Sequence, residues 1–235
     1  MRKEKPILND NLFSIDGLFY SLVKLIENNI IGFREELKNA IFEYKENDDL
    51  KKEQLENEDD VTTILRRFLS DLDSTFDFEL QTKAPEKNEK TDIGILRKYS
   101  KPRHIPFCII EAKRLPTPFY SGSQETEYVC YKNVKKQGGI ERFKTGKHGN
   151  KLPISLMIGY IQKENANHWY TKVNEWITEQ ILKSSNDGIS WINEDMLSKD
   201  LVFKDDEIIT KYTSDHLKSN SEKIKLYHYW IDLMN

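Results

Sequence analysis

Residues 91–96 (TDIGIL) and 107–113 (FCIIEAK) decide the fold that the sequence predicts. Both segments are rich in Ile, Leu, Phe and Cys, and the polar turn between them contains Pro102, so together they predict a β-hairpin. A turn centred near Pro102 pairs Asp92 with residue 112, one position from Glu111. Side chains alternate along a strand, so Glu111 and Lys113 are expected on the same face of the sheet.

Two carboxylates and one ammonium group are therefore predicted to meet at one point on the sheet. Neighbouring carboxylates repel each other unless a cation joins them. Oxygen-only sites of this kind suit hard divalent ions such as Mg²⁺. The alternative interpretation is a solvated salt bridge at the end of a hairpin, which contributes at most about 1 kcal/mol.

The segments around the hairpin predict a definite order of elements. Helical spacing of apolar residues occurs in residues 58–73, 124–143 and 166–182, and strand patterns occur in residues 75–81 and 153–161. Acidic residues gather at the start of the first helix, where the macrodipole favours them. Two glycines, Gly138 and Gly139, are expected to break or kink the second helix, and the run at 153–161 predicts burial on both faces. The resulting order is helix, three strands, helix, strand, helix.

The two ends of the chain are predicted to extend this core. Residues 10–45 carry apolar side chains at helical spacing in two groups, which predicts two helices. Residues 200–209 have the pattern of two strands around a polar turn, and residues 223–234 that of a final strand. We expect an N-terminal helical extension over residues 1–50 and one main domain over residues 51–235.

The pattern of Asp92 followed by Glu111-Ala112-Lys113, in this order of elements, resembles the PD-(D/E)XK nuclease superfamily. The resemblance covers residues 57–182, and it implies an α/β protein with a restriction endonuclease-like core, a central mixed sheet flanked by helices. It implies that Asp92 and Glu111 are catalytic and bind Mg²⁺, for which Mn²⁺ substitutes. It also implies that Lys113 orients the attacking water and stabilises charge. Thr91 stands where the family's nominal proline is found.

The resemblance extends to three further side chains. Many members of the superfamily have a Glu on the first helix that completes the acidic wall of the site, a role that falls to Glu58. The alternative for Glu58 is ordinary capping and complementation of the helix dipole. The helix after the Lys strand often supplies Gln or Tyr residues to the site, which makes Gln124 and Tyr128 candidates for substrate binding.

A glycine-rich basic loop follows that helix. It offers backbone N–H groups together with Arg142, Lys147 and His148, a combination that suits phosphate oxygens. We therefore assign Arg142 and Lys147 to substrate binding. The alternative is a helix that ends at glycine with basic residues near its last carbonyls, and for His148 that structural role is preferred.

Composition agrees with this interpretation. A chain of 235 residues can bury one sizeable core. Its net charge is −3, yet residues 101–151 contain eleven Lys and Arg against four Glu, which fits a phosphate-bearing substrate or simply a solvated face. Two cysteines, Cys108 and Cys130, support neither a disulfide framework nor a zinc site. Without an apolar signal-peptide core or a run of about eighteen apolar residues, we expect a cytoplasmic protein without a membrane partner.

The resemblance implies a magnesium-dependent nuclease that acts on nucleic acid, with DNA as the expected substrate, in restriction or another antiviral defence. The alternative is a nuclease-fold module that binds nucleic acid or a protein partner without cleaving. Double-strand cutting would require two active sites, which a homodimer could supply. The apolar stripe expected to form that dimer consists of Leu18, Phe19, Leu22 and Ile26.

Overall fold

A computed structural model describes nine segments of the chain: residues 15–47, 58–72, 75–80, 91–98, 105–117, 125–131, 137–183, 189–200 and 208–234, with the side chains of 16–38 in the first. The helices are α1 (Ile15–Asn47), α2 (Glu58–Leu72), η2 (Glu125–Tyr128), α3 (Gly139–Lys144), α4 (Ala166–Leu182) and η3 (Asn193–Asp195), where η denotes a 3₁₀-helix. The strands are β1 (Phe76–Leu80), β2 (Ile93–Arg97), β3 (Cys108–Leu115), β4 (Ile154–Ile161), β5 (Ser198–Lys199), β6 (Ile209–Leu217) and β7 (Lys223–Asp232).

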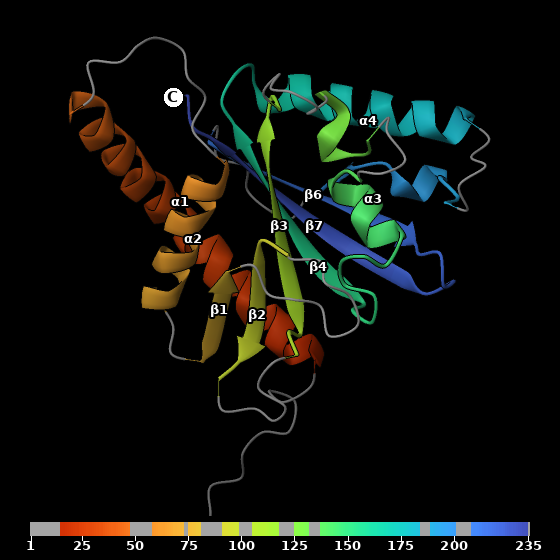
Figure 1. Ribbon diagram of the computed structural model, residues 1–235, viewed down its shortest axis with the longest axis horizontal. Coiled ribbons are helices and arrows are strands. Elements are labelled where there is room, and N and C mark those ends of the chain that lie inside the picture. The colour runs from red at the N-terminus through yellow and green to blue at the C-terminus, as the bar shows by residue number, and fades with distance from the viewer. Residues whose placement is uncertain are drawn as a thin grey trace, which may run out of the picture.

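All seven strands form one mixed sheet in the order β1-β2-β3-β4-β7-β6-β5 (Figure 1). The pairs β1–β2 and β2–β3 are antiparallel, and so are the pairs β7–β6 and β6–β5. At the centre, β3, β4 and β7 are parallel. The α/β class and the mixed sheet flanked by helices are as the sequence predicts.

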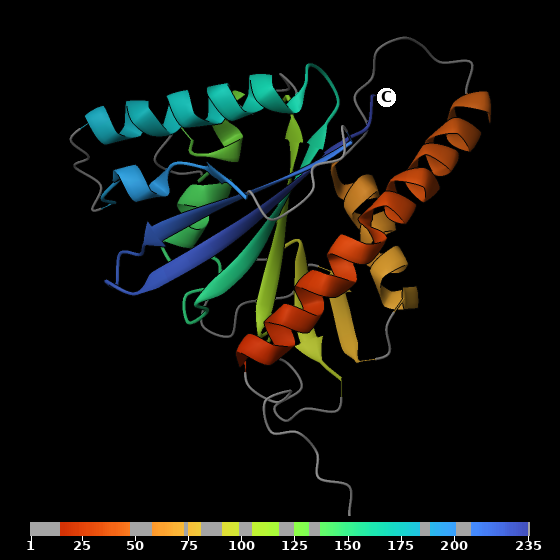
Figure 2. The same ribbon diagram turned by 180° about the vertical axis from the view of Figure 1, so that it is seen from behind.

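Each face of the sheet has its own hydrophobic core. Side chains alternate along a strand, so Ile110 and Ala112 of β3 point into the core that α1 and α2 cover. Ile109 and Leu115 point to the opposite face, where η2, α3 and α4 pack. Figure 2 shows α1 crossing one face of the sheet. Strand β4 is buried on both faces, as its apolar run predicts.

The prediction of two helices over residues 10–45 is wrong where the structure describes the chain. One helix of 33 residues, α1, spans most of that range. Its buried side chains follow each other three or four residues apart without a break: Leu22, Ile26, Ile30, Phe33 and Leu37. Because this spacing continues through the middle of the segment, one face of a single helix can pack against the sheet.

The stripe assigned to a homodimer is used within the chain itself. Phe19, Leu22 and Ile26 are buried in the core between α1 and the sheet, and Leu18 packs against the same core. This face is therefore not available for a second copy. It also makes α1 part of the main hydrophobic core that it shares with the sheet.

The helix predicted over residues 124–143 is largely replaced by other structure in the described part of that range. Residues 125–128 form only the short η2, and α3 begins at Gly139, with Gly138 as its N-cap. A Cβ atom on Gly138 would lie 2.5 Å from the backbone nitrogen of Cys130. The glycines therefore start a helix where two segments of backbone touch, instead of breaking one.

The C-terminal part of the chain completes the sheet. The predicted final strand corresponds to β7, which lies between β4 and β6 in the interior of the sheet. Of the two strands predicted within residues 200–209, the second corresponds to the start of β6, which continues to Leu217. Residues 201–207 lie outside the described segments. None of the described helices is both long enough and apolar enough to cross a membrane.

Candidate active site

Strand β3 brings the predicted Glu111 and Lys113 to one face of the sheet. They are 0% and 2% exposed. The hairpin register pairs Ile93 with Ile110, so one further step places Asp92 against Glu111. The predicted register, with Asp92 opposite residue 112, is therefore wrong by one residue. The shift moves Asp92 into direct line with Glu111.

Among the residues that the structure describes, no strand pairs antiparallel with the C-terminal half of β3, because β2 begins at Ile93. Two carboxylates take the place of such a strand. The backbone N–H of Ala112 donates to Asp92 Oδ2 at 2.8 Å, and the backbone N–H of Arg114 donates to Glu58 Oε2 at 3.1 Å. Glu58 is the first residue of α2, so the start of this helix is fixed to the open edge of β3.

The Lys113 ammonium lies among three carboxylates. Its Nζ is 2.9 Å from Glu58 Oε1, 3.0 Å from Glu111 Oε1 and 4.0 Å from Asp92 Oδ2. Burial by itself lowers the pKa of Lys113, but the surrounding carboxylates outweigh burial and hold that pKa well above its usual value. Lys113 is therefore a fixed positive charge at the centre of the site.

Basic side chains lie close to both oxygens of Glu111. Arg142 Nη1 donates to Oε1 at 2.5 Å, and His148 Nδ1 lies 3.0 Å from Oε2. Burial raises the pKa of this carboxyl, but Lys113, His148 and Arg142 outweigh it and hold the pKa well below its usual range. The short helix α3 positions Arg142, whose Nε also donates to the backbone oxygen of Gln137 at 3.1 Å. Glu111 is therefore ionised at neutral pH.

Asp92 is in a different electrostatic state. Burial and the neighbouring charge of Glu111 raise its pKa to about 7, although Lys113 and the N–H of Ala112 act in the opposite direction. A proton or another cation is therefore needed to neutralise the repulsion between Asp92 and Glu111 near pH 7. Such a pair can take up a divalent cation by releasing a proton.

The donor chemistry of the cluster fits Mg²⁺ or Mn²⁺. Asp92, Glu111 and Glu58 offer carboxylate oxygens only, and Glu111 Oε2 is a buried oxygen without a hydrogen-bond donor among the residues that the structure describes. Within the same residues, however, no three His, Cys, Asp or Glu side chains are arranged to hold one metal ion as they stand. The Lys113 ammonium lies between the carboxylates instead.

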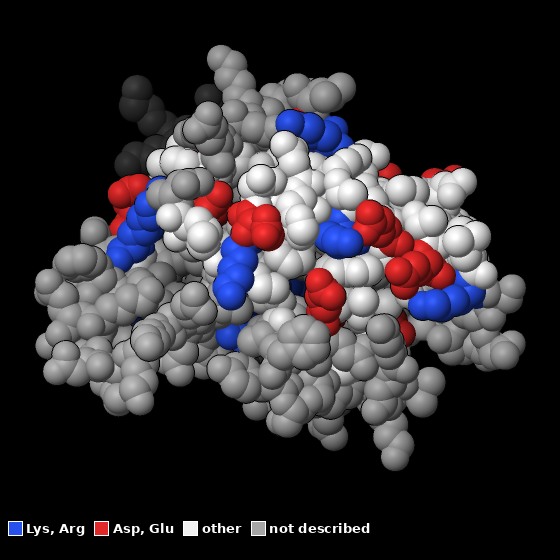
Figure 3. Space-filling model, turned by 90° about the horizontal axis from the view of Figure 1, so that it is seen from above, with Lys and Arg blue, Asp and Glu red and all other residues white. Residues whose placement is uncertain are grey.

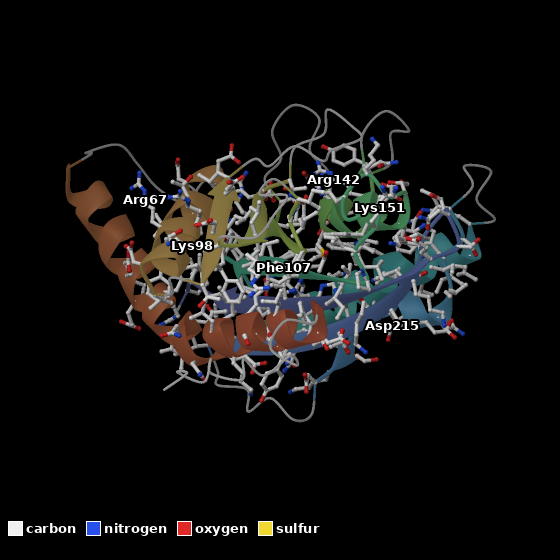
Figure 4. The ribbon with its side chains drawn as sticks, turned by 90° about the horizontal axis from the view of Figure 1, so that it is seen from below. Arg67, Lys98, Phe107, Arg142, Lys151 and Asp215 are labelled. Atoms are coloured by element: carbon white, nitrogen blue, oxygen red, sulfur yellow. The ribbon has the colours of Figure 1, made fainter. Side chains whose placement is uncertain are left out.

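The residues predicted to bind substrate lie in different places relative to the site. Arg142 lies on α3 at the site, with Lys151 in the adjoining loop (Figure 4). Lys147 is half-buried in that loop, and Gln124 lies outside the described segments. On the face displayed in Figure 3, described basic and acidic side chains lie next to each other, without a field of one sign.

Tyr128, which the resemblance made a candidate for substrate binding, lies inside the protein. It is fully buried, its hydroxyl lies 2.9 Å from His228 Nδ1, and it accepts a hydrogen bond from Trp230 Nε1 at 2.8 Å. The partners of Tyr128 lie a hundred residues away on β7. Its own sequence neighbourhood gives no sign of them.

Tyr128 is one end of a buried polar chain that sequence reasoning missed. From His228 the contacts continue through Ser214 to His216 at 2.7 and 2.6 Å. His216 Nδ1 is 2.6 Å from Asp195 Oδ1, which also accepts from Lys144 Nζ at 2.6 Å. The chain thus joins η2 to the end of α3, the two short helices that border the site.

His148 is a second residue at the site that sequence reasoning missed, since a structural role was preferred for it. Gly146 and Gly149 have φ angles of +69° and +61°, a conformation that glycine adopts without strain. These two turns direct His148 inward, and its backbone N–H donates to the Arg142 oxygen at 3.1 Å. The spacing of the two glycines around His148 was the available signal.

Comparison of the chain with models of protein families, with curated proteins and with solved structures found no match. The chemistry assigned to the site therefore rests on the geometry of its own residues.

Proposed function

We propose that this chain is a magnesium-dependent nuclease with a restriction endonuclease-like core, and that it hydrolyses phosphodiester bonds in DNA. The observation that carries the proposal is the convergence of the Glu58, Asp92 and Glu111 carboxylates on Lys113 at the open edge of β3. A salt bridge at the end of a hairpin needs one acid and one base. Three acids around one buried base form a costly arrangement, which supports a functional role.

Asp92 and Glu111 are the residues that would hold Mg²⁺, or Mn²⁺ in its place. A bound ion of this kind polarises the phosphate and lowers the pKa of its water. The raised pKa of Asp92 supports this assignment, because a carboxyl that is half-protonated near pH 7 gives up its proton to a cation at little cost.

The chain's own cations act on the substrate's charge. Lys113 is held in place by Glu58 and by its hydrogen bond to the Ala112 oxygen at 2.6 Å. A positive charge fixed in this way can orient a water molecule and stabilise negative charge on a phosphate without reorganisation. Arg142, whose side chain is 29% exposed, is the cation that a phosphate can reach from solvent.

The test is incubation of the purified protein with single- and double-stranded DNA and RNA, in Mg²⁺, in Mn²⁺ and in EDTA. We expect product only with a divalent ion, and none from Glu111→Gln. The matched control is Glu175→Gln, which removes a carboxylate from an exposed ion pair on α4 and should cleave at the wild-type rate. If no nucleic acid is cleaved under any condition, the proposal is wrong.

One observation favours a second candidate function, a module that binds nucleic acid without cleaving it. Lys113 and Arg142 both contact the Glu111 carboxylate, so two of the chain's own cations already offset part of the acidic charge of the site. In that case, nucleic-acid affinity would fall steeply with salt, because binding releases condensed counterions. It would be unchanged by EDTA, and no product would form.

A further inference from the structure

We infer that His148 is a metal ligand, and that Glu111 Oε2 and His148 Nδ1 together bind a divalent transition-metal ion such as Mn²⁺. The inference rests on the proposed function in that Glu111 serves both. It goes beyond that function by adding an imidazole to a site that otherwise offers only oxygen.

The first observation is a pair of buried polar atoms that face each other without a bond. Glu111 Oε2 and His148 Nδ1 are 3.0 Å apart, and their residues are 0% and 2% exposed. By hydrogen-bond geometry, neither atom has a partner among the described residues. A buried polar atom in this state calls for an explanation, and an ion is one of the few available.

The second observation is a third buried polar atom without a partner, on the same face of the sheet. Ser155 Oγ is buried and lacks a hydrogen-bond partner in the described part of the chain. Ser155 lies on β4, and its hydroxyl lies against Gly149, the residue that follows His148. Alternation along the paired strands places Ser155 on the Glu111 face of the sheet. An ion bound at Glu111 and His148 would give those two atoms a partner, on the face of the sheet where Ser155 also lies.

The geometry of the pair matches two ligands of one ion. Ligands that lie about 2.1 Å from a cation and subtend a right angle, as in octahedral coordination, are separated by about 3.0 Å. In such a pair the nitrogen lone pair points at the ion and away from the line between the two ligand atoms. Glu111 is free to serve in this way because Lys113 and Arg142 both contact its other oxygen, Oε1.

The ligand set determines which ion is preferred. Mg²⁺ takes oxygen ligands, whereas imidazole nitrogen favours first-row transition metals. One imidazole combined with carboxylates suits Mn²⁺, and it predicts that the site binds Mn²⁺ more tightly than Mg²⁺. The two glycine turns and the ring contact of Phe143, 5.9 Å between centroids, fix the imidazole before any ion arrives.

The experiment is pulsed electron paramagnetic resonance of Mn²⁺ bound to the whole protein. We expect modulation from a directly coordinated nitrogen in the wild type, with its frequency changed by ¹⁵N-labelled histidine. His148→Gln should lose the nitrogen signal and bind Mn²⁺ at least about tenfold more weakly, with a smaller change for Mg²⁺. His168→Gln, a half-buried histidine on α4, should keep both the signal and the affinity.

Bound Mn²⁺ without nitrogen modulation in the wild type would overturn the inference, and that result needs no variant to fold. A nitrogen signal that persists in His148→Gln, or no Mn²⁺ binding, would overturn it as well. The proposed function is tested separately. Cleavage in Mg²⁺ without a nitrogen signal sinks this inference alone, whereas a nitrogen signal without cleavage supports it and sinks the nuclease.

Discussion

Replacement of Asp195 by alanine should destabilise the protein more than any ion-pair substitution on its surface. Asp195 is fully buried and accepts hydrogen bonds from Lys144, from His216 at its Nδ1 and, at 2.7 Å, from the Ile192 backbone N–H. Asp195→Ala leaves all three donors without an acceptor. One of them is the Lys144 ammonium, which is itself 0% exposed.

The expected size of the effect follows from that burial. Removal of one partner of a buried ion pair typically costs about 3–5 kcal/mol, because the remaining charge is left without compensation. Typical domains have a total stability of about 5–15 kcal/mol, so Asp195→Ala should lose a large part of it. Adding Lys144→Met to Asp195→Ala should recover stability, since the uncompensated charge is then gone.

Urea unfolding followed by tryptophan fluorescence measures the change in the free energy of unfolding. Trp191 lies beside the buried pair, with its ring centre 4.9 Å from Lys144 Nζ. The control is Glu175→Ala in the exposed pair with Lys172, which should cost less than about 1 kcal/mol. If Asp195→Ala also costs less than about 1 kcal/mol, or if Lys144→Met restores nothing, the assigned role of the buried pair is wrong.

Three further predictions concern the site and its support. Lys113→Met should lower the cleavage rate by roughly 100- to 1000-fold without weakening Mn²⁺ binding. Single-turnover kinetics measures the rate and calorimetry measures the Mn²⁺ affinity. Cleavage by Lys113→Met at the wild-type rate would contradict the role of Lys113. Burial lowers the pKa of His216 and of His228 below 6.5, so the unfolded chain takes up protons that the folded chain does not. Asp92, whose pKa is raised to about 7, acts in the opposite direction over the same pH range, so the comparison is made in an Asp92→Asn background. There the free energy of unfolding should fall as the pH drops below about 6.5, and equal urea midpoints at pH 7.5 and 5.5 would exclude this. Gly138→Ala places a Cβ 2.5 Å from a backbone nitrogen of the segment after η2 and should lower the free energy of unfolding by at least about 1–3 kcal/mol. The control is Gly32→Ala, where the Cβ meets only a side chain at 3.5 Å and which should be neutral or stabilising. Equal urea midpoints for the two variants would refute the clash.

The parts of the fold that depend on local pattern could be predicted from the sequence. The hairpin, α2, β4, α4 and β7 follow from apolar periodicity, which local side chains determine. The meeting of Asp92, Glu111 and Lys113 follows from hairpin pairing, with an error of one residue in the register. Glu58 comes from the resemblance, and its bond to the Arg114 backbone gives that assignment a physical basis.

The parts that depend on distant contacts could not be predicted. Tyr128 bonds to His228 and Trp230, which lie about a hundred residues later, and no local pattern encodes such a pairing. The glycines before α3 suggest a break when only the sequence is considered, because their close contact with backbone near Cys130 is a tertiary feature. His148 is functional in our interpretation only because two glycine turns direct it inward.

The short β2 has a consequence for how this protein can change over evolutionary time. Asp92 and Glu58 each accept a hydrogen bond from a main-chain N–H of β3 that no strand in the described segments satisfies, so both acids support the sheet independently of any chemistry at the site. A relative without the proposed activity would still be under selection to keep both acids, because their loss leaves polar backbone without a partner. The presence of acids at these two positions therefore indicates the architecture of the sheet and does not by itself indicate activity. Among relatives, the residues at positions 113 and 148 should be the ones that distinguish active enzymes from inactive proteins of the same fold.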